Sequence, residues 1–530
     1  MAAFAFPART ILAPSRRTRL IWGLSTATLL IHLLTNGRYG YFRDELYFIA
    51  CSRHLDFGYV DMSPLCAWLL RLELTLFGDS LFALRLFPAI AGALTVALTG
   101  AIARELGGRV WAVALACTAS MSALVYLGIG NFYSMNVFEP LFWMGCVYLL
   151  VRIINSSSAA ESINPPPSTI NRLWLPFGLI AGLGFENKHS FAFFGAAIVV
   201  ALLLTPERRH LAQRWIWLGG LIAFAIALPN LLWQMRHDWP TLELLRNVAR
   251  SDKNVVLGPL QFVAQQILIM NPATFPIWFG GLIWLLTARD GRRYRLLGIV
   301  YLVTLAEFIL MHGKHYYLAP VYPMLFAAGS VAVERLVAFR VQWVKPVLIA
   351  AMIGLAALLA PTILPVLAPE RLLAYMRAIH FEPPRTETGH IAALPQLFAD
   401  QFGWEEIVRS VARAYATLSP DDQARVGIFC QNYGQAGAID FFGPKYGLPP
   451  ALSGHQNYYL WGSRNYTGEL MLVIDSRPDD EREQFRTVED LGVVDSSPWA
   501  MPWEQRQHIY LCRGLKTAMH DFWPQVKEWL

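Results

Sequence analysis

The feature that most constrains this chain is a series of long stretches without a charged residue. Asp, Glu, Lys and Arg are absent from residues 86–103, 110–138, 215–235, 254–288, 315–333 and 346–369. A helix needs about 20 apolar residues to cross the hydrocarbon layer of a membrane, and its backbone polar groups must be paired within the helix there. Hydrophobic residues make up 55% of the chain and charged residues 15%. The sequence therefore predicts a mainly α, polytopic transmembrane helix bundle.

The basic residues in the loops between these stretches indicate in which direction each predicted helix crosses the membrane. Arginine and lysine concentrate near residues 104–109, 208–214, 289–295 and 335–345. Because basic loops stay on the cytoplasmic side, alternation from them gives roughly eleven spans, with the N-terminus inside and the C-terminus outside. The Ser- and Pro-rich residues 154–172 are predicted to be a cytoplasmic linker. The net charge of +6 thus reflects membrane topology, and nucleic acid is not expected as a partner.

Two further regions are predicted outside the membrane. In the external loop 36–80, apolar residues from Leu65 to Phe77 recur at helical spacing, with Arg71 and Glu73 opposite, which indicates an amphipathic helix on the outer face. Residues 258–271 have similar character. From residue 370 the charge pattern is that of a soluble protein, so we expect a membrane part at 1–369 and an extracytoplasmic α/β domain at 370–530. Residues 426–430 and 470–474 are predicted strands, with a helix at 432–442 between them.

The six cysteines do not form a recognisable framework. Cys430 and Cys512 could form a disulfide in the C-terminal domain, although nothing requires it. The sequence shows no CxxC pair and no zinc-ligand spacing. We therefore expect no cofactor and name no metal ligands, while the dependence of the activity on a metal stays open.

An acidic pair, Asp44 and Glu45, follows the first predicted span. An apolar chain places few carboxylates near its membrane faces, and those are candidates for function. The alternative is that the pair is the solvated start of a loop.

Other polar residues gather at the predicted external ends of the helices. The candidates for substrate binding there are Asp61, Asn136, Lys188, His189, Arg236, Lys314, His315 and Tyr317, with Glu139 as a further acidic group. A lysine at such a position is a natural partner for a lipid phosphate. The alternative is a snorkelling side chain at the interface. Taken together, these residues predict one cavity at the outer leaflet, walled by carboxylates and cations.

Several of these residues belong to motifs that occur in a fixed order. The motifs are Arg43-Asp44-Glu45, Gly58-Tyr59-Val60-Asp61-Met62-Ser63-Pro64-Leu65, Arg85-Leu86-Phe87-Pro88, Met135-Asn136-Val137-Phe138-Glu139-Pro140-Leu141, Gly182-Leu183-Gly184 with Lys188, and Lys314-His315-Tyr316-Tyr317-Leu318-Ala319-Pro320. In this order they resemble glycosyltransferase family 39 and its bacterial dolichyl-phosphate-mannose-protein mannosyltransferase-like relatives. The chain departs from that family at Glu139, where Asp is commoner, and at Ser63, which replaces a proline.

The resemblance implies the large integral-membrane glycosyltransferase fold and a polyprenyl-phosphate-linked sugar as donor. It implies that Asp44 is the base of an inverting single displacement, that Glu45 orients Asp44 or pairs with a cation, and that Glu139 shapes the donor or acceptor side. Tyr59 joins the substrate-binding residues named above, whose cations would stabilise the leaving phosphate. The expected site faces the outside of the plasma membrane. The acceptor stays open between protein, lipid and envelope glycan.

Proteins of two other functional classes would have a comparable hydropathy pattern. A transporter or flippase of a lipid-linked or small substrate would show inverted repeats and ionisable residues at mid-bilayer. No repeat is evident, and Glu307 is the exception to a one-sided placement of charges. A non-catalytic scaffold for polymer assembly would be expected to have lost the acidic pair, which is intact here.

Two segments of the C-terminal domain combine amides with aromatic rings. They are residues 431–437 and 454–461. This combination is typical of sugar or peptide binding, because rings stack on apolar sugar faces while amides bond to hydroxyls. The alternative is that these rings pack the domain against the membrane part.

Overall fold

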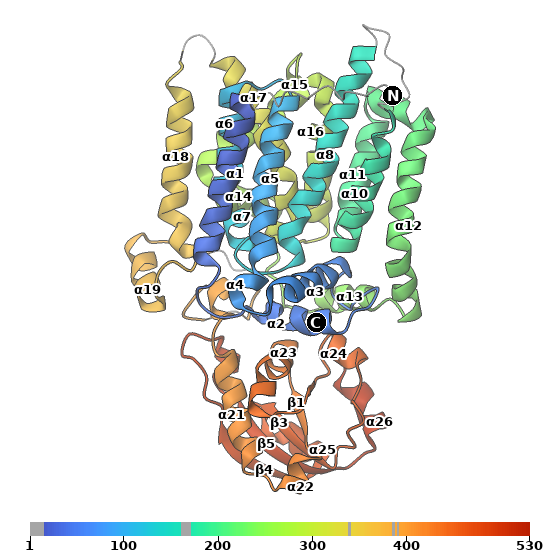
Figure 1. The fold of residues 1–530 in the computed structure, drawn as a ribbon, viewed down its shortest axis with the longest axis vertical. Helices are drawn as coiled ribbons and strands as arrows, with labels where there is room; N and C mark the ends of the chain where they lie inside the picture. The colour runs from blue at the N-terminus through green and yellow to red at the C-terminus, as the bar shows by residue number, and fades with distance from the viewer. Residues whose placement is uncertain (1–14, 161–170, 338–340, 384–386, 390–391) are drawn as a thin grey trace, which may run out of the picture.

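The computed structural model describes residues 15–160, 171–337, 341–383, 387–389 and 392–530. Long helices run side by side in a bundle, and a small α/β domain lies at one end of it (Figure 1). The core of the predicted linker, residues 161–170, lies outside the described residues.

The bundle accounts for most of the chain. Its helices are α1 (Arg16–Thr35), α5 (Leu86–Glu105), α6 (Val110–Ser122), α7 (Leu124–Ile129), α8 (Met135–Ala160), α10 (Trp174–Asn187), α11 (Phe191–Leu203), α12 (Arg214–Arg236), α14 (Pro259–Ile269), α15 (Phe275–Thr287), α16 (Arg295–Leu310), α17 (Tyr322–Leu336) and α18 (Val344–Leu359). Among the described residues, five helices are long and apolar enough to cross a membrane, or up to seven if each of two bent pairs is one span. The predicted polytopic bundle is confirmed, while the number of roughly eleven spans stays a prediction.

Small residues allow the closest helix contacts. A Cβ placed on Gly178 of α10 would lie 2.0 Å from the carbonyl oxygen of Gly219 in α12. A Cβ on Gly329 of α17 would lie 1.8 Å from the carbonyl oxygen of Ile277 in α15. Glycine at these points lets backbones touch, which is how helices associate where burial of apolar surface gives little driving force.

A layer of short helices lies across the end of the bundle that faces the domain. It comprises α2 (Arg43–Arg53), α3 (Leu65–Phe77), α4 (Leu81–Leu84) and α13 (Pro240–Arg250) (Figure 1). The predicted surface helix is confirmed as α3, and its Leu76 is 60% exposed. The polar face was predicted wrongly at Glu73, which is buried because its Oε1 accepts a 2.6 Å hydrogen bond from the Phe87 amide at the start of α5. Burial raises the pKa of the Glu73 carboxyl to about 9.

The C-terminal domain contains one five-stranded sheet of order β2-β1-β3-β5-β4. The strands are β1 (Gly427–Cys430), β2 (Ala451–Leu452), β3 (Leu470–Asp475), β4 (Phe485–Val493) and β5 (His508–Leu515). β1 runs parallel to β2 and β3, whereas β5 runs antiparallel to β3 and β4. The helices α21 (Trp404–Ala416) and α23 (Tyr433–Phe442) pack on it. Both predicted strands and the helix between them are confirmed.

The two faces of the sheet belong to different cores. Cys430 packs in a cluster that also contains Leu46 of α2, whereas Cys512 packs in the cluster on the opposite face. Side chains alternate between the faces of a strand, so these two thiols point apart and both are free. The suggested disulfide is therefore excluded. Because one core runs from α2 into the sheet, the division at residue 370 stays a prediction.

Candidate active site

Glu45 lies fully buried at the start of α2. Its carboxylate forms a two-point ion pair with Arg85, with Nε to Oε1 and Nη2 to Oε2 both at 2.8 Å. It also accepts backbone hydrogen bonds from Phe42 at 2.8 Å and Tyr133 at 2.7 Å. Every acceptor direction of the carboxylate is thus used inside the protein. Of the two roles expected for Glu45, the structure shows the pairing with a cation, and its place among the catalytic residues stays a prediction.

Asp44, one residue earlier on the helix, points elsewhere. Its side chain is 33% exposed. The Tyr433 hydroxyl of the C-terminal domain donates a 2.8 Å hydrogen bond to its Oδ1, and the Arg43 guanidinium lies 3.6 Å away. Asp61 lies within its electrostatic reach and accepts a 2.8 Å hydrogen bond from Tyr47. Burial raises the pKa of Asp61 to about 6, and the charge of Asp44 adds to the shift.

Two lysines from other segments lie within the electrostatic reach of Asp44. Lys314 Nζ forms a 2.7 Å ion pair with Glu387 Oε1. Burial alone would lower the pKa of the Lys314 amine. Electrostatic interactions with Tyr317, Glu387 and Asp44 outweigh this effect, so the pKa of Lys314 is raised. Lys253 lies beside them in the loop after α13, where burial lowers the pKa of its amine and Glu387 and Asp44 act in the opposite direction.

Lys253 was missed by sequence reasoning, although a signal was present. It stands directly before the charge-free stretch 254–288, the same kind of position that identified Lys314 before residues 315–333. The structure ties its loop to residue 387 by a bridge from Asn254 to Glu387.

Lys188 organises a second polar cluster. Its Nζ donates to Asn136 Oδ1 at 2.8 Å and to Glu139 Oε2 at 3.0 Å. Asn136 and Glu139 are three residues apart on the first turns of α8, so one cation can reach both. The ammonium lies 4.3 Å from the centre of the Tyr317 ring, and the Ser190 hydroxyl donates to Glu139 Oε1. Tyr317 belongs to the 3-10 segment η4 (His315–Val321), directly after Lys314, and so links the two clusters.

Among the described residues, the remaining four predicted substrate-binding residues form no hydrogen bond or ion pair with Asp44 or the three lysines. The Tyr59 hydroxyl is buried within its own loop, 3.1 Å from the carbonyl oxygens of Cys51 and His54. His189 Nε2 is 2.9 Å from Asn230 Oδ1 and so ties α12 to the turn before α11. The other two are His315, which is buried, and Arg236, which is exposed at the end of α12 and forms no ion pair or hydrogen bond with any described residue. Their roles in substrate binding stay predictions.

The aromatic segment 454–461 serves packing. Trp461 stacks on His54 of the membrane part with ring centres 4.3 Å apart. Asn457 Oδ1 accepts a 2.7 Å hydrogen bond from the Val60 amide, and the Tyr458 hydroxyl donates to Asp440 within the domain. These contacts support the packing interpretation of this segment over sugar binding.

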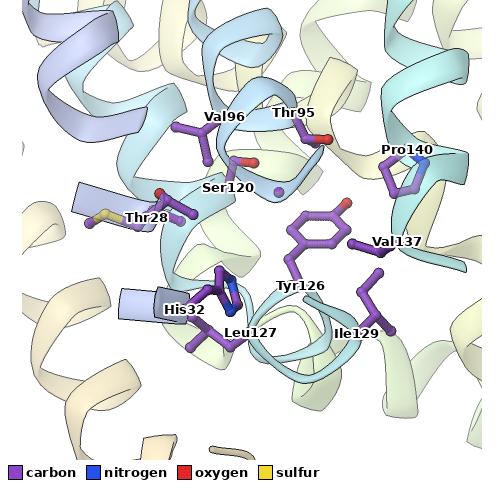
Figure 2. Close-up of a pocket in the computed structure, with 12 residues that line it drawn as sticks. Thr28, His32, Thr95, Val96, Ser120, Tyr126, Leu127, Ile129, Val137 and Pro140 are labelled. Carbon is purple, nitrogen blue, oxygen red and sulfur yellow. The ribbon is translucent and has the colours of Figure 1, made fainter. Parts of the chain in front are cut away.

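Two cavities have linings that do not include Asp44 or the three lysines. Figure 2 shows His32, Thr28, Thr95, Ser120 and Tyr126 around one of them, between the helices of the bundle. Its volume of about 10 Å³ is far below the roughly 300–1,000 Å³ of a ligand pocket. The other, of about 440 Å³, lies in the C-terminal domain and is lined in part by Gln431, Asp475 and Glu481. The candidate catalytic and substrate-binding residues line neither cavity, although Gln431 and Gly454 of the larger one belong to the amide and aromatic segments of the C-terminal domain.

Part of the chain is similar in sequence to known membrane glycosyltransferases. Residues 61–233 match the family model of dolichyl-phosphate-mannose-protein mannosyltransferase. The chain is 28% identical over 277 residues to the lipid A galacturonosyltransferase RgtD of Rhizobium johnstonii, covering 50% of this chain and 55% of that protein. It is 26% identical over 220 residues to the undecaprenyl phosphate-alpha-4-amino-4-deoxy-L-arabinose arabinosyl transferase of Pseudomonas savastanoi, covering 39% and 40%. The chain thus spans about half the length of the curated relatives it matches.

Solved structures extend the likeness to the whole fold. The apo crystal structure of ArnT from Cupriavidus metallidurans superposes with a TM-score of 0.60 at 16% identity, covering 94% of this chain and 98% of that one. The same protein bound to undecaprenyl phosphate gives 0.58 at 16% identity, covering 93% and 98%. The large integral-membrane glycosyltransferase fold is confirmed. The chain is thus a multi-pass membrane protein with the large integral-membrane glycosyltransferase fold, and part of its sequence is similar to membrane glycosyltransferases.

Proposed function

We propose that the protein transfers a sugar from a polyprenyl-phosphate donor to an acceptor outside the plasma membrane, by inverting single displacement. The observation that carries this proposal is the placement of a partly exposed carboxylate, Asp44, within the electrostatic reach of the half-buried cations Lys253 and Lys314. The names of the relatives support it, since one is a lipid A galacturonosyltransferase and the other uses an undecaprenyl-phosphate sugar.

The proposed chemistry assigns one role to each kind of charge. The oxygen of the acceptor hydroxyl attacks the anomeric carbon of the sugar, and Asp44 takes the hydroxyl proton. The bond between that carbon and the phosphate oxygen breaks, and the electron pair leaves with the phosphate. Cations near this oxygen stabilise the developing negative charge, and they act most strongly where water is excluded.

The three lysines differ in how far their charge is already balanced. Lys188 pairs with Glu139 at 3.0 Å and Lys314 with Glu387 at 2.7 Å. Lys253 has no ion-pair partner within 4 Å among the described residues, and it is surrounded by Arg43 and Lys314 as well as by Glu387 and Asp44. Lys253 is half-buried, and removing an ammonium from water without a close counter-ion is costly, so an arriving phosphate would be bound favourably beside Lys253.

The outward orientation of the site is part of the proposal. It is supported by the arginine-rich loops at 208–214 and 289–295, which the positive-inside rule assigns to the cytoplasm. The candidate charges gather where the bundle meets the C-terminal domain, whereas a transporter would hold them at mid-bilayer.

Mass spectrometry of lipids and envelope glycans from cells with and without the protein tests the function. We expect one sugar-bearing species to disappear without the protein and an unused polyprenyl-phosphate sugar to accumulate. The identity of the lost species would name both the sugar and the acceptor. Identical lipid and glycan profiles in the two strains would contradict the proposal.

A further inference from the structure

The C-terminal domain docks directly on the helix that carries Asp44. Two glycines of α23, Gly434 and Gly437, are three residues apart and therefore share one face of the helix. A Cβ on Gly437 would lie 2.8 Å from the carbonyl carbon of Leu46 in α2, and a Cβ on Gly434 would lie 2.6 Å from Cγ of Arg43. Only hydrogen side chains fit here, so α23 approaches the backbone of α2.

The start of α23 is held in place from within the domain. Asn432 caps the helix, and its Oδ1 accepts hydrogen bonds from the amides of Gly434 at 2.9 Å and Gln435 at 3.0 Å. The buried Glu504 accepts from both side chains, at 2.9 Å from Asn432 Nδ2 and 2.8 Å from Gln435 Nε2. The first residue of the helix, Tyr433, is thereby fixed in position relative to α2.

Tyr433 places its hydroxyl on the candidate base. Its Oη donates to Asp44 Oδ1 at 2.8 Å. The ring packs 4.8 Å from that of Tyr47, and the Arg43 guanidinium lies 5.4 Å from its centre. Burial raises the pKa of the Tyr433 phenol well above its usual value, and Asp44 adds to this while Arg43 opposes it. The phenol therefore stays protonated and able to donate.

We propose that Tyr433 is a positioning residue for Asp44, so that the C-terminal domain completes the active site of the membrane part. This inference rests on the proposed function. The phenol fixes the carboxylate through Oδ1 and leaves Oδ2 directed to take the proton of the acceptor hydroxyl. The ring of Tyr433 and the glycines of α23, all in the C-terminal domain, thus set the orientation of a base that is carried by α2.

A double-mutant cycle tests this role. Membranes that contain each variant are supplied with lipid extract from cells lacking the protein, in which unused donor accumulates, and the released polyprenyl phosphate is measured. Tyr433→Phe should lower the maximal rate by roughly 10-fold, because a hydrogen bond to a charged group is lost. The half-saturating amount of extract should not change. In an Asp44→Asn background, Tyr433→Phe should cause no further loss, because its effect passes through Asp44.

Controls separate positioning from folding. Tyr446→Phe loses a hydroxyl that bonds Glu405 elsewhere on the domain and should keep the full rate. Gly437→Ala should reproduce the loss seen with Tyr433→Phe, because its Cβ meets the backbone of Leu46, whereas Gly354→Ala, whose Cβ meets open space, should not.

Three results would overturn the inference. They are a full rate for Tyr433→Phe, an equal loss from Tyr433→Phe with and without the Asp44 carboxylate, and a change confined to the half-saturating amount of extract. A failure of the proposed function looks different, because Asp44→Asn alone would then keep the full rate.

Discussion

Asp44 and Glu45 are neighbours in the sequence, yet their surroundings are opposite. Successive residues of a helix point about 100° apart, and here one carboxylate turns into the protein while the other turns toward the C-terminal domain. Glu45 is 0% exposed and Asp44 is 33% exposed. The sequence could predict that this acidic pair matters, but not which member is free, because that depends on where Arg85 and Tyr433 arrive from distant segments.

Replacing Glu45 tests whether its carboxylate stabilises the fold through Arg85 or takes part in the reaction. Glu45→Gln leaves the buried Arg85 without its counter-ion, so we expect the free energy of unfolding to fall by about 3–5 kcal/mol. Denaturant unfolding in mixed detergent micelles measures this. Glu105→Gln, which loses a partly exposed contact of 3.6 Å with Arg104, should cost about 1 kcal/mol or less. A stable Glu45→Gln protein that loses only its turnover would show that Glu45 acts in the chemistry.

Removing single cations tests the proposed phosphate site. Lys253→Met and Lys314→Met should each weaken binding of polyprenyl phosphate by roughly 10-fold, as expected for one charge-assisted contact. Lys253→Arg should restore binding only partly, because a planar guanidinium differs from a point charge. Equilibrium binding in nanodiscs is the measurement, with Lys445→Met, an exposed lysine of the C-terminal domain, as the control. Unchanged binding in both Met variants would assign these lysines to interfacial anchoring.

At the level of helices and strands, the elements that depend on a local sequence pattern were predicted correctly. The helical repeat from Leu65 to Phe77 was sufficient to predict α3. The apolar runs at residues 426–430 and 470–474 were sufficient to predict β1 and β3. The strand β4 was not predicted, because it lies at the edge of the sheet, pairs only with β5 and exposes most of its residues. The burial of Glu73 was also missed, since it depends on the amide of Phe87 at the start of another helix.

The glycine contacts between helices predict a sharp difference between adjacent positions on α15. A Cβ on Gly281 would lie 2.4 Å from the carbonyl oxygen of Leu325 in α17, whereas a Cβ on Gly280 meets nothing within 4 Å. Gly281→Ala should therefore destabilise the bundle by about 1–3 kcal/mol through overpacking, and Gly280→Ala should not. Thermal unfolding in detergent compares the two. Equal unfolding temperatures would show that α15 and α17 do not touch at this point.

At the scale of the whole molecule, the candidate site lies at the junction of the bundle and the C-terminal domain. Asp44, Asp61, Lys188 and Lys314 were found from motifs and their expected places at helix ends. Tyr433 lies in the predicted segment 431–437, but its contact with Asp44 could not be predicted, because it spans 389 positions and exists only once the domain has docked. The same docking explains why rings predicted for sugar binding, such as Trp461, are used for packing.

The proposed topology predicts where each end of the bundle lies. A reporter active only in the cytoplasm should be silent when fused after Leu530, because the C-terminal domain is expected outside. The same reporter inserted between Asp290 and Gly291, in an arginine-rich loop, should be active and serves as the matched control. A strong signal from the Leu530 fusion would overturn the orientation and the outward-facing site with it.

The most direct test of the central claim is the rate of sugar transfer by purified Asp44→Asn protein in nanodiscs. The substitution keeps the size of the side chain and its ability to accept from Tyr433, but removes its basicity. Release of polyprenyl phosphate should fall by at least about 100-fold, while binding of polyprenyl phosphate and the unfolding temperature match the wild type. Asp79→Asn, an exposed carboxylate of the same loop, should keep the full rate. A well-folded Asp44→Asn protein that transfers sugar at a near-normal rate would contradict the account.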